Sequence, residues 1–430
     1  MHVRTPFILL ALLLPFAGCD SVNAPDESAA KAPVFPDPKQ SPERTEFEKI
    51  ATKRNELSIK RKTLAADQKS EQNRQLEKNP IVMSESDPGG STPPPPRTPE
   101  QRENSRLIRE LRGEQAKIET ELNIEFLKFS ENEYFPAVRK YAKFCHKVFI
   151  AEPNKANGGE LYELADILYE NGDLEQAYLY ATDLLKHGFE SAEIYDLATA
   201  AAYCTEHFVE SIEFFEKAMA HGPCRRTLLV AVVSEFDESK KAWEIEKDIR
   251  AKEAAADDLP RVKLETDVGD MVYELFENEA PETVGNFISL VESGRYDDTT
   301  FFGISLTVGV YHGLITGDRD QGPDYSIFSE SNKPNHRFPF RGSLVSQVRN
   351  EHDNPSIYGI MFRSSPYSFG NYTTFGRVVE GIDVLAKIAK YNARTPMPGM
   401  EKTKIIKATV LRKRDHEYKP HKVETAATGS

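Results

Sequence analysis

The carboxy-terminal fold is decided by residues 262–276, VKLETDVGDMVYELF, and residues 280–291, APETVGNFISLV. Hydrophobic and polar residues alternate on both sides of a glycine-containing turn in the first segment, which predicts a β-hairpin. The second segment opens with Pro281 and repeats its apolar residues at helical spacing, which predicts an amphipathic helix. Short strand-like runs follow, with a second helix expected at 381–390. This pattern predicts a closed β-barrel with two capping helices.

The same region resembles a known family. Residues 264–301, LETDVGDMVYELFENEAPETVGNFISLVESGRYDDTTF, resemble the opening of a cyclophilin-type peptidyl-prolyl isomerase. Residues 341–346, RGSLVS, are similar to its central strand, and residues 375–388, FGRVVEGIDVLAKI, to its closing strand and helix. The resemblance covers residues 261–412 and implies a cyclophilin-like barrel that binds proline-containing peptides.

The resemblance also implies where the catalytic residues should lie. The family uses an arginine in a Phe-His-Arg motif as the main hydrogen-bond donor around the twisting amide, but the matching segment here is Phe301-Phe302-Gly303-Ile304. Gly303 therefore stands at the arginine position, and no catalytic residue is intact. The remaining groove candidates are Phe301, Ile315, Arg349, Met361, Phe369 and Tyr372. Core packing is favoured for Ile315, whereas Met361 and Tyr372 fit the core and the groove equally. Arg319, Arg349 and Arg363 are candidates to reach the groove from neighbouring strands.

Two functions remain open at this point. The first is an isomerase that acts on prolyl bonds of exported proteins. The second is a non-catalytic scaffold that binds peptides or proteins. Ile315 and Gly359 also stand where the resemblance places glutamines. Because the loss of one transition-state donor commonly costs about 10²–10³ in rate, the loss of several favours binding over efficient isomerisation.

A helical domain is expected at residues 100–257. Two segments beginning at Gly158 and Ala192 match position for position at a spacing of 34 residues. They resemble tetratricopeptide repeats, with a Gly172-Asp173 turn between the two helices of the first unit. The resemblance implies a protein partner for this region. The alternative is a helical bundle in which the spacing arises by chance.

The repeat region carries most of the net negative charge of the chain. Residues 158–223 contain 14 acidic and two basic side chains, against a net charge of −13 for all 430 residues. This array can steer basic partners, although acids that simply solvate the exposed faces are favoured. The acidic balance excludes a general nucleic-acid binder, since phosphate contacts need clustered Lys and Arg.

The amino terminus predicts export. Residues 1–18, MHVRTPFILLALLLPFAG, combine a basic start with an apolar run too short to span a bilayer. The junction before Cys19 resembles a bacterial lipoprotein signal, which implies lipidation of Cys19 and attachment to a membrane at the periplasmic face or cell surface. The alternative is a plain secretory peptide with an incidental cysteine.

The other segments are linkers, a charged helix and a tail. The composition predicts a disordered tether at 19–43, a charged helix at 44–78, a Pro/Gly-rich linker at 79–99 and a disordered tail at 413–430. The helix has one thin apolar seam, which fits either a solvated single helix or a coiled coil. No motif indicates a metal site or a cofactor, and the three cysteines after Cys19 are interpreted as small buried hydrophobic residues.

Overall fold

The computed structural model describes residues 40–78, 106, 109, 113, 117, 118, 120–222, 226, 232–305, 309–312, 325–349, 352–391, 402–419 and 421–424. The predicted signal peptide, Cys19, nearly all of the tether and the linker at 79–99 lie outside these residues. Residues 39–141 belong to one compact unit, whereas residues 142–394 and 402–430 belong to another. Within the described part of the chain, no helix is long and apolar enough to cross a membrane.

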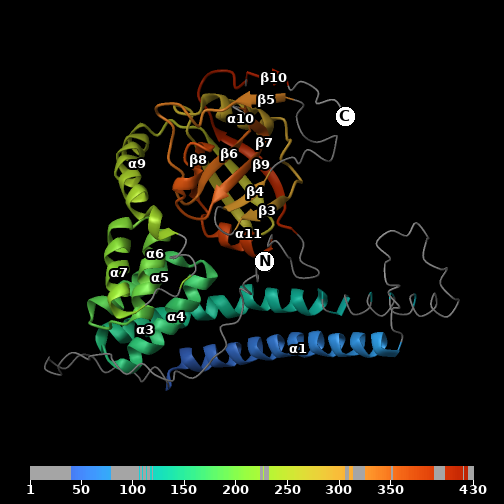
Figure 1. The fold of residues 1–430 in the computed structure, drawn as a ribbon, viewed down its shortest axis with the longest axis vertical. Coiled ribbons are helices and arrows are strands. Elements are labelled where there is room, and N and C mark those ends of the chain that lie inside the picture. Colours follow the sequence, from blue (N-terminus) through green and yellow to red (C-terminus); the bar gives the residue numbers. More distant parts are fainter. Residues whose placement is uncertain are drawn as a thin grey trace, which may run out of the picture. The chain divides into compact units, whose positions relative to one another are not determined.

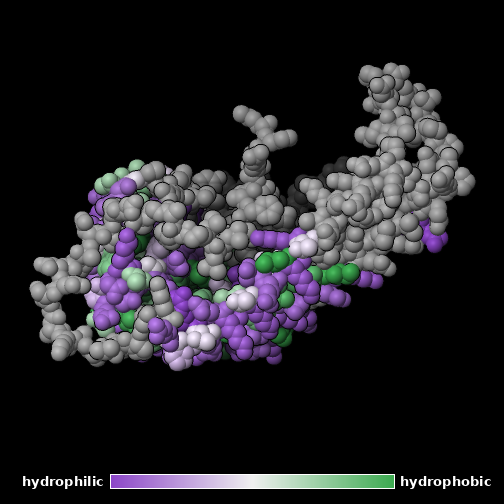
Figure 2. All heavy atoms as spheres, turned by 90° about the horizontal axis from the view of Figure 1, so that it is seen from below, coloured by the Kyte–Doolittle hydropathy of each residue, from purple (hydrophilic) through white to green (hydrophobic). Residues whose placement is uncertain are grey.

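The smaller unit contains a long helix, α1 (Pro42–Lys78), which covers the charged segment predicted at 44–78. Phe47 on its apolar seam stacks on Tyr141, with ring centroids 5.0 Å apart. Arg61 lies over the ring of Phe126 at 4.5 Å from the ring centroid. The seam is therefore covered by a later helical segment of the same chain. The face shown in Figure 2 is mainly hydrophilic, with hydrophobic side chains only in small groups.

A helical region precedes the sheet, as the sequence predicts. Its described helices include α3 (Phe135–Ala151), α4 (Lys155–Asn171), α5 (Leu174–Lys186), α6 (Ala192–Cys204), α7 (Phe208–His221) and α9 (Phe236–Ala256). Consecutive helices from α4 to α7 pack against one another (Figure 1). The side chain of Asn154 caps the first turn of α4 by accepting from the amides of Ala156 and Asn157. Gly172 ends α4 with φ +92°, a left-handed conformation that favours glycine, so the predicted turn is present.

Helix α6 lies at the centre of this region. Every residue from Ile194 to Cys204 is buried, so the helix is enclosed on all sides. Its alanines leave room for close helix packing, and Tyr203 is fully buried. Cys145 and Cys204 are also buried, which confirms their interpretation as small hydrophobic residues.

In the described residues, ten strands form one curled antiparallel sheet (Figure 1). The strands are β1 (Arg261–Thr266), β2 (Gly269–Leu275), β3 (Phe301–Ser305), β4 (Gly309–His312), β5 (Tyr325–Phe328), β6 (Ser343–Arg349), β7 (His352–Met361), β8 (Tyr372–Glu380), β9 (Ile405–Arg412) and β10 (Val423–Glu424). Their order is β10-β5-β7-β6-β8-β2-β1-β9, and β4 pairs with both β7 and β3. The predicted hairpin is β1–β2, and β6 lies between β7 and β8, as expected of the central strand.

The sheet is a half-barrel, which corrects the predicted closed barrel. Among the described residues, its β3 and β9 edges meet at an isolated bridge between Thr300 and Lys404. Two hydrogen bonds flank this bridge, from the Phe301 amide to the Thr403 carbonyl at 3.0 Å and from the Ile405 amide to the Thr299 carbonyl at 2.8 Å. A closed barrel needs a continuous ladder between its first and last strands, and this contact involves too few residues to make one.

Two helices pack against the sheet, as predicted. Helix α10 (Pro281–Glu292) opens at its proline, and α11 (Val384–Tyr391) follows β8. The buried carboxylate of Glu330 satisfies the first turn of α10 by accepting from the amides of Glu282 at 3.2 Å and Thr283 at 2.9 Å. The side chains that face the helices form one apolar core, which includes Leu264, Tyr273, Phe287, Ile288, Phe301, Leu344, Tyr358, Ile360, Phe375 and Ile405.

The described part of the tail, residues 413–419 and 421–424, is folded, so the prediction of a disordered tail at 413–430 is wrong for these residues. Tyr418 is only 6% exposed, and its hydroxyl donates to Glu277 at 2.9 Å. Val423 and Glu424 then pair with β5 as strand β10. The polar composition of the tail did not indicate these two contacts, since they involve only one buried tyrosine and one short strand.

Candidate functional site

The candidate peptide-binding face is the outer side of β6 and β7. Tyr358 and Ile360 of β7 belong to the core, so Gly359 and Met361 lie on the opposite side of the strand. Gly359 pairs with Val345 of β6, which shares this outer side. Gly359, Met361 and Val345 are all buried, so this part of the outer face is packed rather than open.

The structure separates the predicted groove residues. Phe301 is fully buried inside the sheet core. Met361 is also fully buried, but it lies outside that core. Phe369 is 36% exposed and is joined by an isolated bridge to the half-buried Tyr372 at the start of β8. The structure thus brings Phe369 and Tyr372 together at the surface and places Phe301 in the interior.

The remaining predicted positions are located only by their backbone or not at all. Gly303 lies in β3, opposite Tyr311 of β4. Arg349 ends β6 and pairs with His352 at the turn into β7, and its side chain is outside the described part. Ile315 and Arg319 lie in residues that the structure does not describe.

Arg363 is held by the helical region. One of its terminal nitrogens donates to the carboxylate of Glu235 at 3.1 Å and to the Ser364 carbonyl at 2.8 Å. Glu235 ends the short helix η3 (Val233–Glu235), which leads into α9. The Arg363 side chain is only 7% exposed. In this arrangement the guanidinium of Arg363 is directed to Glu235 and is not available to donate hydrogen bonds to a bound peptide.

Phe369 is the most exposed ring among these candidates, and its neighbours come from one segment. It follows the short helix η4 (Pro366–Ser368). His336 stacks on it with ring centroids 4.3 Å apart, and Phe338 lies 5.1 Å away. Phe338 belongs to a second core cluster, shared with helices α6, α7 and α9. The surface ring is therefore connected by direct contact to the interior of the helical region.

Sequence reasoning missed Arg337, which lies beside these rings. Its guanidinium donates to Glu246 at 2.9 and 2.7 Å and also to Glu253, and it covers the ring of Phe276 at 3.8 Å. Burial alone lowers the pKa of Arg337, but the two carboxylates outweigh burial and raise the pKa above its usual range. The available signal was the run 337–341, RFPFR, whose rings fit no strand pattern of the sheet.

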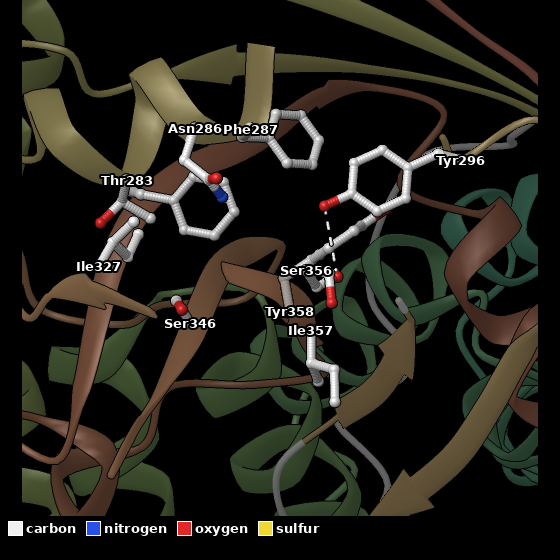
Figure 3. A pocket seen from close by; sticks show the side chains of 10 residues that line it. Thr283, Asn286, Phe287, Tyr296, Ile327, Ser346, Ser356, Ile357 and Tyr358 are labelled. Carbon is white, nitrogen blue, oxygen red and sulfur yellow. Dashed lines mark hydrogen bonds between the residues drawn. The ribbon is translucent and has the colours of Figure 1, made fainter. Parts of the chain in front are cut away.

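A small cavity lies beneath α10 (Figure 3). The Tyr296 hydroxyl donates to the Ser356 carbonyl at 3.3 Å, and Tyr325 donates to Asn286 at 2.8 Å. Burial raises the pKa of Tyr296 well above its usual range. The cavity volume of about 10 Å³ holds one water at most, so this is not a peptide site. Among the described residues, no cluster of His, Cys, Asp and Glu is arranged to hold a metal ion.

Comparisons with known proteins agree with the resemblance seen in the sequence. The family model described as cyclophilin type peptidyl-prolyl cis-trans isomerase/CLD matches residues 261–410. Peptidyl-prolyl cis-trans isomerase-like 1 of Gibberella zeae is 30% identical over 154 residues, which are 35% of this chain and 94% of the relative. The protein of the same name from Neurospora crassa is 30% identical over 158 residues, which are 36% of this chain and 97% of the relative.

Among solved structures, a cyclophilin type peptidyl-prolyl cis-trans isomerase of Cryptosporidium parvum is 23% identical. The match covers 36% of this chain and 99% of that protein, with a TM-score of 0.33. The family assignment therefore depends on the sequence relatives, which the chain covers almost completely. Through residues 261–410, the chain belongs to the cyclophilin-type peptidyl-prolyl cis-trans isomerase family.

Proposed function

We propose that this chain binds proline-containing segments of exported proteins through its cyclophilin-type domain and isomerises them slowly or not at all. The observation that carries the proposal is Gly303 in β3, at the position where the resemblance places the catalytic arginine. Prolyl isomerisation must cross an amide barrier of about 18–20 kcal/mol. A catalyst lowers such a barrier by binding the twisted amide more tightly than the planar forms. Glycine offers no side-chain donor for that purpose.

The contacts of Arg363 support the same conclusion. A substitute arginine would need its guanidinium free to donate to the substrate amide. Arg363 instead donates to Glu235 and to a backbone carbonyl, in a nearly buried position. Moving it to a peptide would leave the Glu235 carboxylate without this partner. The described residues thus favour recognition of prolyl segments over efficient catalysis.

The proposal extends to the other parts of the chain. Lipidation of Cys19 would hold the protein at a bacterial membrane surface, where exported clients pass. Helices α4 to α7 form two successive helix pairs with a glycine at the first turn, which supports a tetratricopeptide-like arrangement able to receive a protein partner. In the alternative function, the same chain is a scaffold whose two folded regions bind proteins without acting on prolyl bonds.

The test compares the full chain with its Gly303→Arg variant. An alanyl-prolyl test peptide is titrated by NMR, and exchange spectroscopy measures the cis–trans interconversion rate in the same samples. We expect the unmodified chain to bind the peptide without accelerating interconversion, and the variant to accelerate it measurably. Acceleration by the unmodified chain would establish the isomerase instead. Absence of peptide binding by both proteins would refute the proposal and favour the alternative function as a protein-binding scaffold.

A further inference from the structure

Two segments that border the candidate site are anchored on the helical region. The first is residues 337–341, RFPFR, which lead into β6. Phe340 is fully buried, 5.1 Å from the ring of Trp243 on α9 and 6.0 Å from Phe208 on α7. The flanking Arg341 donates to Glu175 on α5. The phenylalanine rings of this segment therefore pack into the helical core, and the guanidinium of Arg341 is hydrogen-bonded to helix α5.

The second segment is residues 363–369, which connect β7 to Phe369. The hydroxyls of Ser364 and Ser239 lie 2.8 Å apart, and Ser239 on α9 is fully buried. The Tyr203 hydroxyl of α6 lies 3.2 Å from Ser239. Together with the Arg363–Glu235 pair, these contacts fix the start of the segment on α6 and α9.

The two segments meet at Phe369. Its amide donates to the Pro366 carbonyl at 3.0 Å, which closes a tight turn and leaves the ring half exposed. Phe338 lies 4.9 Å from Phe340 on one side and 5.1 Å from Phe369 on the other. Phe338 thus joins the helical core to the surface ring of the candidate site.

We propose that the helical region is a positioning element of the peptide site, and that Phe338 holds the ring of Phe369 in place for a prolyl ligand. This inference rests on the proposed function, because it assumes that Phe369 contacts the bound peptide. An aromatic ring that is already ordered loses less conformational freedom when a ligand binds. Affinity for a prolyl peptide should then depend on a residue that the ligand never touches.

The test uses the full chain with Phe338→Leu, which keeps an apolar side chain in the helical core but removes the flat face against Phe369. The matched control is Phe215→Leu, the same substitution in a ring that packs against the same core cluster. Phe215 on α7 contacts the ring of Phe236 and belongs to neither of the two anchored segments. Both variants lose one ring of this cluster, so a difference between them reports on Phe369.

Two measurements are made on each protein. Hydrogen exchange of the amides at 366–372 reports the order of the segment, and titration with an alanyl-prolyl peptide reports affinity. We expect Phe338→Leu to speed exchange in this segment several-fold and to weaken peptide binding about fivefold, corresponding to the ordering of one aromatic side chain. Phe215→Leu should leave both quantities close to those of the unmodified chain.

Each contrary result has a separate meaning. Equal exchange at 366–372 in the two variants overturns the positioning role, whatever the peptide does. Faster exchange with unchanged affinity overturns the claim that positioning sets affinity. If the unmodified chain binds no peptide, the proposed function fails, while the exchange data still decide whether Phe338 holds Phe369 in place.

Discussion

Replacement of Arg337 by methionine should strongly destabilise the larger unit. The Arg337 side chain is 1% exposed, and its partners Glu246 and Glu253 are 4% and 7% exposed. Methionine fills part of the same space but leaves two buried carboxylates without their shared cation. Removing one partner from such a buried group costs about 3–5 kcal/mol. Arg250 and Arg377 still contact the two carboxylates, so we expect about 3 kcal/mol.

The assay is urea and thermal unfolding of the full chain. A loss of about 3 kcal/mol corresponds to roughly 6–12 °C in melting temperature for a unit of this size. The matched control is Lys247→Met, which removes the cation from the exposed Lys247–Glu244 pair on α9, the helix that also carries Glu246 and Glu253. An exposed pair contributes at most about 1 kcal/mol, so the control should barely move the transition. Equal shifts in the two variants would refute the buried network as a source of stability.

Three further predictions concern other contacts of this unit. In urea unfolding, Gly172→Ala should destabilise the unit by about 1–3 kcal/mol more than Gly188→Ala. Both glycines have positive φ, but a Cβ added at Gly172 meets the Cβ of Ala386 at 2.5 Å, whereas a Cβ added at Gly188 meets no atom within 4 Å. Equal losses would contradict this close approach. Phe340→Ala should cost about 3–5 kcal/mol in the same assay, because the ring is fully buried, and a loss below about 1 kcal/mol would contradict its place in the core. The carbonyl of Glu417 and the carboxylate of Glu277 raise the pKa of His416. The stabilising contribution of protonated His416 to tail docking is therefore fully present below about pH 6.5 and is lost as pH rises through the raised pKa. Amide exchange at 414–424, corrected for intrinsic rates, should therefore quicken with rising pH, and His416→Gln should remove that dependence.

The sheet was predictable where the sequence carries a local signal. Alternation and a glycine turn identified the β1–β2 hairpin, and Pro281 marked the start of α10. Whether the barrel closes was not predictable, because closure depends on the register between β3 and β9, which are far apart in the chain. The folded tail was missed for a similar reason, since Tyr418 is buried only after Glu277 is placed beside it.

The candidate site was less predictable than the fold. The resemblance gave Phe369 and Tyr372 as two of six groove candidates, and the structure joins these two by an isolated bridge. It could not show that Phe301 faces the core, because an apolar residue in a strand fits either side of the sheet. Nor could it show the role of Arg337, whose acidic partners lie more than 80 residues away in α9.

The RFPFR segment also constrains how this chain can evolve. Its two arginines and two phenylalanines belong to the sheet region by sequence but contact residues of the helices. Recombination at the boundary between the two regions would therefore break these contacts. A barrel borrowed from a free-standing relative would leave Glu246 and Glu253 without the arginine that they share. Positions 246, 253 and 337 should therefore vary together among descendants, and a lineage that discards α9 should also lose the arginine at 337.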